Sequence, residues 1–343
     1  MHDQLLEALL AVANVRLVAS YTDGQLGFPG NDAIQLFIPD LHLLSAARRA
    51  RYPYGTNNED ILIQVVKALI DLKAAAGPRA QSVEVIHIGD YLDLWRETLL
   101  PLTDPDVPDR IRDSHQELVD LLEDPNLNTS FLLGNHDFDL YRLDAYNTWE
   151  RRFFIPGGAP GALVMHGDYF DWVEREVPAE IRDIAVYLFG ESHPPGSAVL
   201  GQMQDLSHKY NGQKDYTNQI QLAAPAALGA LQAGELAIPD NYNLQTAESS
   251  VNAGLTFLQS ACRECVNANT QFGTHLRMAI IGHTHHARIA TMAMPDGSSF
   301  ALVDTGAWIE NCVEDEHGTA FPNAQIAALS ANQVRIYQLD PKG

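Results

Sequence analysis

Five short apolar runs in this chain end in side chains that bind metals or move protons. Each run is followed within a few positions by Asp, Asn or His, usually next to Gly or Pro. The runs and their polar ends are IQLFIPDLHL (Asp40, His42), VEVIHIGDYLD (Asp90, Asp93), TSFLLGNHD (Asn135, His136, Asp137), ALVMHGD (His166, Asp168) and MAIIGHTHH (His283, His285). A buried strand has no packing reason to end this way, so the pattern predicts one shared polar site.

The number and type of these side chains indicate metal ions. Seven of them are too many for one tetrahedral zinc, but they suit two ions of about five to six coordination that share a carboxylate. Carboxylate and amide oxygens mixed with imidazoles favour Mn, Fe or Zn over Ca or Mg. We therefore expect two divalent ions, manganese first, with iron or zinc as alternatives. The seven are Asp40, His42, Asp90, Asn135, His166, His283 and His285.

Strands and helices must bring these ends together. The five runs read as buried strands, and sites in open α/β sheets form at the carboxyl ends of strands. Residues 59–77 have apolar positions at helical spacing, with Asn58 as the expected N-cap and Gly77 as the stop. Residues 109–125 repeat this pattern before Pro125. Alternation of strands and helices predicts parallel strands joined by right-handed crossovers.

The remaining segments complete the predicted organisation. Residues 1–33 are expected to be a helix-plus-loop extension ahead of a domain that spans 34–343. Residues 177–275 are rich in Ala, Leu and Gln and predict a helical insertion that caps the site. Residues 298–308 and 324–339 are β-rich and are expected to form a second sheet that packs on the first.

Cys262 and Cys265 form a C-x-x-C pair. Together with Val251, Leu255 and Leu258 they fall at spacings typical of the apolar stripe of a helix. No second cysteine pair is present to complete a zinc site. We therefore expect both cysteines to pack in the core.

Composition restricts the partners. The chain has 343 residues, of which 44 are acidic and 22 basic, for a formal charge of -22. Such a charge repels polyanions, so nucleic acid and anionic membranes are disfavoured as partners. The N-terminal stretch lacks a basic leader region, no run of about 18 apolar residues occurs, and three cysteines cannot form a disulfide framework. These features predict a cytoplasmic protein without stable membrane insertion.

The motifs DLH, GDYLD, GNHD, HGD and GHTH resemble the blocks of the calcineurin-like metallophosphoesterase superfamily. The resemblance covers roughly residues 34–310 outside the insertion. It implies an α/β fold with a four-layer α/β/β/α sandwich of two mixed sheets and a helical cap. DLHL, HGD and DTGAWIE are most similar to UDP-2,3-diacylglucosamine pyrophosphatase-like members of the superfamily. His136 is a departure, because lipid A pathway enzymes are expected to have arginine there.

The resemblance also implies a role for each residue. One ion would be held by Asp40, His42, Asp90 and His285, and the other by Asp90, Asn135, His166 and His283. A hydroxide bridging the ions would attack phosphorus, and His136, oriented by Asp93, would protonate the leaving group. Asp137 and Asp168 each lie beside a ligand and are as well suited to fixing a loop or orienting an imidazole as to binding metal. His87 and His286 are interpreted as structural. Candidate substrate contacts are Arg48, Arg49, Arg51, Arg96, Arg142 and Trp308.

The sequence thus predicts a hydrolase of small phosphomonoesters, phosphodiesters or pyrophosphates. One alternative is the UDP-2,3-diacylglucosamine-type pyrophosphatase of lipid A synthesis, which would need an apolar groove in the insertion. An alternative of another class is a protein-binding scaffold on the same fold. Such a scaffold could lose metal ligands, whereas all seven are present here.

Overall fold

The computed structural model describes residues 2–23, 33–49, 56–77, 82–98, 102, 104–146, 148–150, 152–155, 161–170, 258–294, 296–309 and 324–342. Most of the expected insertion, residues 177–257, lies outside these ranges. Within them the chain forms an α/β structure with two mixed sheets, as the sequence predicted. No helix among the described residues is long and apolar enough to cross a membrane.

The first sheet has six strands in the order β1-β11-β10-β2-β3-β4. Its parallel part is formed by β2 (Ile34–Ile38), β3 (Val83–His87) and β4 (Thr129–Phe131). The remaining strands, each antiparallel to its neighbours, are β10 (Gln325–Ser330), β11 (Gln333–Asp340) and β1 (Asn14–Thr22). The sequence placed residues 324–339 in a second sheet, but β10 pairs with β2 and therefore extends the first.

The second sheet has five strands in the order β5-β6-β7-β9-β8. Its centre is parallel and consists of β6 (Gly161–Met165), β7 (Leu276–Ile281) and β9 (Ser299–Asp304). The flanking strands β5 (Arg152–Ile155) and β8 (Arg288–Ala293) are antiparallel to their neighbours. The five ligand-bearing strands are thus divided between two sheets, β2 to β4 in one and β6 and β7 in the other.

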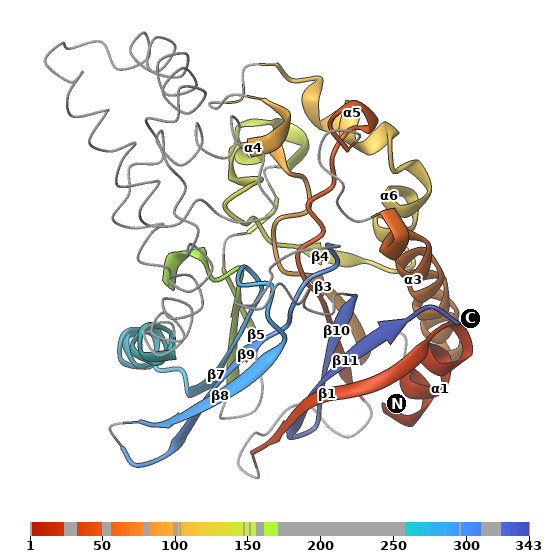
Figure 1. The fold of residues 1–343 in the computed structure, drawn as a ribbon. Helices are drawn as coiled ribbons and strands as arrows, with labels where there is room; N and C mark the ends of the chain where they lie inside the picture. Colours follow the sequence, from red (N-terminus) through yellow and green to blue (C-terminus); the bar gives the residue numbers. More distant parts are fainter. Residues whose placement is uncertain are drawn as a thin grey trace, which may run out of the picture.

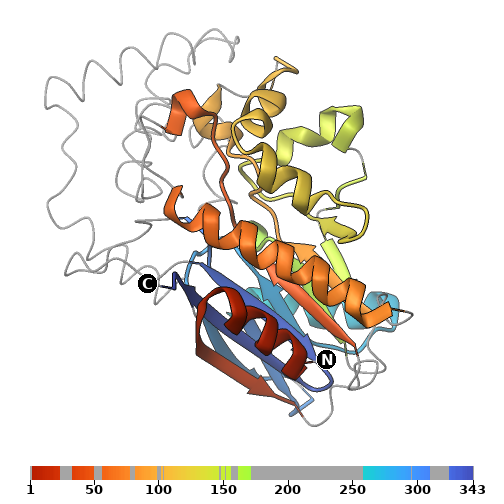
Figure 2. The same ribbon diagram turned by 90° about the vertical axis from the view of Figure 1, so that its right-hand side faces the viewer.

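The helices and the two sheets are arranged in four layers (Figures 1 and 2). Three hydrophobic clusters fill the spaces between these layers. The first lies between the six-stranded sheet and the helices α1 (His2–Val12), α3 (Thr56–Ala76) and α6 (Gln116–Leu122). The second is formed by the facing surfaces of the two sheets. The third lies between the five-stranded sheet and a helix at residues 258–272. The strands β2 and β6 are buried at every position, as expected for strands covered on both faces.

The helix at residues 258–272 contains the C-x-x-C pair. Cys262 is 5% exposed and Cys265 is fully buried, and both are free thiols. They pack with Leu258 against the five-stranded sheet. The expected core role of this pair is confirmed.

Two details of the predicted helices were wrong. α3 begins at Thr56, so Asn58 is not the N-cap of this helix. The side-chain amide of Asn58 instead donates to the backbone oxygen of Trp308 at 3.1 Å. The single helix expected over residues 109–125 is two helices, α5 (Val107–Asp113) and α6. Gly77 does end α3, with a φ of 56° that favours glycine.

The N-terminal segment also differs from expectation. The helix expected in this segment is α1. The loop expected after the helix is instead a strand, β1, which pairs with β11 at the edge of the six-stranded sheet. Leu5 and Leu9 of α1 are fully buried against this sheet. Residues 2–22 therefore belong to the layers of the fold. Short helices complete the described chain: α2 (Ala46–Arg49), α4 (Leu94–Glu97), η2 (Phe138–Arg142), η3 (Asp144–Tyr146) and η4 (Asp168–Phe170).

Candidate metal centre

The polar motifs all follow the carboxyl ends of parallel strands. β2, β3 and β4 of one sheet and β6 and β7 of the other each lead into one motif. Four of the expected ligands have left-handed backbone conformations, with φ values of 46° at His42, 52° at Asp90, 70° at His283 and 59° at His285. This conformation is uncommon for residues other than glycine, and such strain is concentrated at functional sites.

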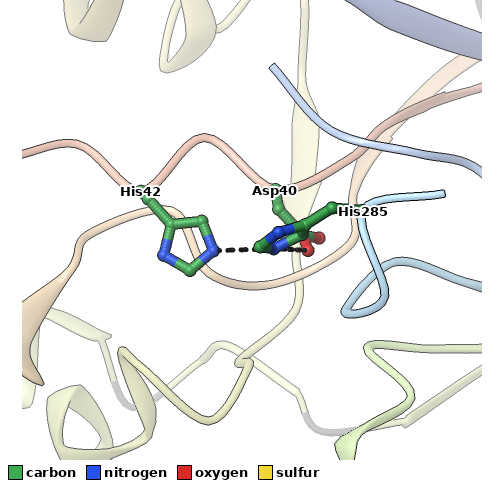
Figure 3. A group of neighbouring side chains, drawn as sticks. All are labelled: Asp40, His42 and His285. Carbon is green, nitrogen blue, oxygen red and sulfur yellow. Dashed lines mark hydrogen bonds and ion pairs between the residues drawn. The ribbon is translucent and has the colours of Figure 1, made fainter. Parts of the chain in front are cut away.

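The first group of side chains consists of Asp40, His42 and His285 (Figure 3). The Nε2 atom of His285 lies 3.1 Å from Asp40 Oδ2 and 3.2 Å from His42 Nε2. Asp40 is fully buried, His42 is 3% exposed, and the side chain of His285 is 16% exposed. Two imidazole nitrogens and a carboxylate therefore face the same small volume.

The second group consists of Asn135, His166 and His283. Asn135 Oδ1 lies 2.9 Å from His166 Nε2 and 3.2 Å from His283 Nδ1. The Nδ1–H of His166 donates to the backbone oxygen of Ile88 at 2.9 Å. That bond leaves Nε2 of His166 with a lone pair that can be directed at a metal ion.

Asp90 lies between the two groups. Its Oδ2 atom is 3.4 Å from His42 Nε2 in the first group and 3.1 Å from His166 Nε2 in the second. Its other oxygen, Oδ1, accepts the backbone N–H of His136 at 2.9 Å. The carboxylate is 1% exposed and is held in place by that bond. The arrangement is compatible with one carboxylate shared by two ions.

The packing around the carboxylates leaves no room for larger residues. A Cβ atom added at Gly134 would collide with Asp90 Oδ1, and one added at Gly282 would collide with Asp40 Oδ1. Asp40 Oδ1 is itself buried without a hydrogen-bond partner among the described residues. A buried carboxylate oxygen without such a partner, beside imidazole nitrogens, fits a cation ligand.

The charges of the site depend on this clustering. Burial alone would raise the pKa of Asp40 and of Asp90, but neighbouring histidines, above all His166, outweigh it and hold both below the ordinary value. For His166, burial opposes protonation, yet Asp90 and Asp40 raise its pKa to about 10. Burial lowers the pKa of His42 to about 4. Ionised carboxylates in a buried pocket require a compensating positive charge. Protonated His166 supplies it in the metal-free protein, and a divalent ion bound at Nε2 in place of that proton would supply it instead.

Asp93 connects the first group to His136. One of its oxygens lies 2.9 Å from His136 Nδ1, and the other lies 3.2 Å from His42 Nδ1. The guanidinium of Arg96 pairs with the same carboxylate. Burial raises the pKa of Asp93, but Arg96 and His136 outweigh burial and hold it well below the ordinary value. The ring of Trp95 stacks on His136 with centroids 4.4 Å apart.

The acidic residues beside these motifs differ in their contacts. Asp137 accepts the backbone N–H groups of Tyr91 and Gly134, both at 2.7 Å, and so fixes the loop after β4. Burial and the nearby Asp90 raise the pKa of Asp137 to about 7. Asp168 is 3% exposed at the start of η4. The loop-fixing interpretation therefore fits Asp137.

The candidate substrate contacts have partners within the chain. Arg48 donates to the backbone oxygen of Glu97, Arg49 pairs with Glu59, and Arg142 pairs with Asp139. Arg96 is 7% exposed and pairs with Asp93, so it is no surface arginine. Trp308 is 3% exposed and lines a cavity of about 20 Å³ beside His42. Arg51 lies outside the described residues. Their roles toward substrate stay predictions.

Two networks near the site were not found from the sequence. His115 contacts Glu59 at 2.9 Å and the backbone oxygen of Leu44 at 2.8 Å, which fixes the chain just after the first motif. Thr284 donates to Asp304 at the end of β9. For Thr284, the only signal in the sequence was its position between two ligand-type histidines. His115 and Glu59 lie 56 positions apart and share no motif, so nothing in the sequence indicated their contact.

No family model matches the chain, and no curated protein matches it. Among solved structures, the crystal structure of a 5'-nucleotidase precursor from Thermus thermophilus is 10% identical over 90% of this chain, with a TM-score of 0.24. The chain covers 54% of that protein's length. Similarity at this level is too low to support an argument about fold or function.

Proposed function

We propose that this chain is a phosphoester hydrolase that depends on two divalent metal ions. The observation that carries the proposal is the position of Asp90, whose Oδ2 faces His42 Nε2 at 3.4 Å and His166 Nε2 at 3.1 Å. A carboxylate between two ligand groups is the feature that lets two cations lie about 3.5 to 4 Å apart and act on one phosphate. Manganese is the proposed metal, with iron or zinc as alternatives.

The proposed ligands fall into two sets that share Asp90. One set adds Asp40, His42 and His285, and the other adds Asn135, His166 and His283. When bound, the two cations would supply Lewis-acid activation of the phosphate and of the attacking water. The hydrogen bonds of the histidines support this allocation, because Nδ1 of His42 contacts Asp93 and Nδ1 of His166 donates to Ile88. In both residues Nε2 is left for a metal.

His136 is the proposed general acid. Its Nδ1 is occupied by Asp93 at 2.9 Å, so Nε2 is the atom that can deliver a proton to the leaving oxygen. Its stacking on Trp95 keeps the ring from turning away. The side chain is 12% exposed, compared with 0% for Asp93, so it lies at the accessible side of this pair.

The four layers and the order of motifs support assignment to the calcineurin-like metallophosphoesterase fold. Of the expected cap at residues 177–275, we retain residues 177–257 in this proposal, because residues 258–272 pack on the five-stranded sheet as its outer layer. The proposed substrate is a small phosphorylated molecule. Because the chain has histidine at position 136, we favour a monoester or diester substrate over the lipid A precursor pyrophosphate. The proposed location is the cytoplasm.

A hydrolysis screen tests this proposal. The protein, loaded with Mn²⁺, is incubated with a phosphomonoester, a phosphodiester and a nucleotide-sugar pyrophosphate. The products measured are phosphate from the monoester, alcohol from the diester, and nucleoside monophosphate with sugar phosphate from the pyrophosphate. We expect hydrolysis of at least one ester, lost on chelation and restored by Mn²⁺. Asp90→Ala should be inactive, while the matched control Asp120→Ala, an aspartate on α6, should retain wild-type rates. Hydrolysis that persists after complete metal removal would contradict the proposal.

A further inference from the structure

The turn at residues 282–286 contacts the proposed metal ligand Asp40, and it is also held by Asp304, which is not a proposed ligand. It carries His283 and His285, both with left-handed backbone conformations, at φ values of 70° and 59°. This conformation is strained in any residue other than glycine, because the Cβ atom comes too close to the carbonyl oxygen that follows it. Thr284 lies between them, and its backbone N–H donates to the backbone oxygen of Gly282 at 2.8 Å. A turn with two strained residues in three positions needs contacts that hold it.

Thr284 supplies such a contact through its hydroxyl group. Oγ1 donates to Asp304 Oδ2, and it accepts the backbone N–H of His286 at 3.3 Å. Asp304 is fully buried at the end of β9, directly opposite Ile281 at the end of β7. The Nε atom of Arg288 lies 3.6 Å from Asp304 Oδ2. The turn is therefore tied by a side chain to the neighbouring strand.

The start and the middle of the turn are held by different residues. The backbone N–H of His283 donates to Asp40 Oδ2 at 2.7 Å, so one end depends on a proposed metal ligand. Thr284 and Asp304 are not ligand candidates and hold the middle of the turn regardless of metal. The side chains on either side then diverge: His283 Nδ1 approaches Asn135, and His285 Nε2 approaches Asp40.

We infer that Asp304, acting through the Thr284 hydroxyl, is a positioning residue that directs His283 and His285 to two different metal ions. This inference rests on the proposed function. A residue that orients a metal ligand typically changes metal affinity by about 10- to 100-fold. Because Thr284 lies between ligands of both ions, its loss should weaken both sites, whereas loss of a single ligand such as His42 should mainly weaken one.

The test compares metal affinity in Thr284→Val and Thr284→Ser. Valine keeps the shape and removes the hydroxyl, and serine restores it. Stepwise Mn²⁺ affinities are measured by competition with a chromophoric chelator, at a temperature where the metal-free variants are folded by circular dichroism. We expect Thr284→Val to lose about 10- to 100-fold in affinity at both steps, and Thr284→Ser to lie near wild type. Ser298→Ala, which removes a hydroxyl bonded to Asp296 beside the same sheet, is the matched control and should not change affinity.

Asp304→Asn provides a second measurement, because asparagine keeps an acceptor for Thr284 without the charge. We expect Asp304→Asn to retain most of the Mn²⁺ affinity, because the turn is held by the hydrogen bond from Thr284 and not by the charge of Asp304. Wild-type affinity at both steps in Thr284→Val would overturn the inference, as would a loss of thermal stability without any loss of affinity. Absence of Mn²⁺ binding by the wild-type protein would instead overturn the proposed function.

Discussion

Replacing His136 with asparagine removes the proposed general acid and leaves the proposed ligands in place. The backbone N–H of residue 136 donates to Asp90 Oδ1 at 2.9 Å, and this bond does not depend on the side chain. Asp93 keeps its contacts with Arg96 and His42. We therefore expect His136→Asn to bind two metal ions like the wild-type protein.

The size of the effect depends on the leaving group. Removing a general acid costs about 10²- to 10⁴-fold in rate, equivalent to about 2.7–5.5 kcal/mol of transition-state stabilisation. An alkoxide leaving group needs the proton and should show this loss. A nitrophenolate is a weak base and needs little protonation, so the same variant should lose about tenfold or less on a nitrophenyl ester.

The assay measures kcat on an alkyl and a nitrophenyl phosphoester, together with metal content, for wild type and His136→Asn. His286→Asn, a change in a histidine beside the ligands to which we assign no catalytic role, is the matched control and should leave the ratio of the two rates unchanged. An equal loss on both esters with two metals bound would refute the acid role. Loss of one metal would make His136 a ligand, since it lies close to His42 and Asp90.

Three further predictions concern residues that support the site. Arg96→Met should lower the free energy of unfolding of the metal-free protein by about 3–5 kcal/mol, measured by urea denaturation, because Asp93 is left without its buried counter-charge. A decrease below about 1 kcal/mol would mean that solvent screens the pair. Gly282→Ala should reduce metal content by displacing Asp40. Gly273→Ala, where a Cβ strains the backbone at a φ of 65° but meets nothing within 4 Å, should keep both ions. Equal metal content in the two variants would contradict this packing argument. Substitutions within residues 177–257 should alter preference among substrates and spare hydrolysis of a small activated diester. Loss of all turnover with both metals bound would mean that this segment supplies catalytic groups.

The strand ends were predictable because each is encoded locally. Within about ten residues, the sequence contains both an apolar run that predicts a strand and the Asp or His that follows the run after a glycine, proline or histidine. The glycines added a further signal, since Gly134 and Gly282 leave room for the carboxylates of Asp90 and Asp40. For these reasons the motifs and the α/β class could be identified without coordinates.

Contacts between distant segments could not be predicted in this way. β1 joins the sheet through pairing with β11, at the far end of the chain, and a sequence of partly exposed residues gave no sign of it. The break between α5 and α6 places His115 against Glu59, which only the packing of α3 explains. Arg96 was expected only as a candidate substrate contact, because its pairing with Asp93 depends on the turn at α4.

The central claim is that Asp90 joins two metal sites, and metal stoichiometry tests it most directly. Wild type, Asp90→Ala and His42→Ala are dialysed to equilibrium against buffered Mn²⁺, and bound metal per chain is measured by elemental analysis. We expect two ions in the wild-type protein, one in His42→Ala and none held tightly in Asp90→Ala, because Asp90 faces both ligand groups. Two ions retained by Asp90→Ala, or none bound by the wild-type protein, would contradict the claim.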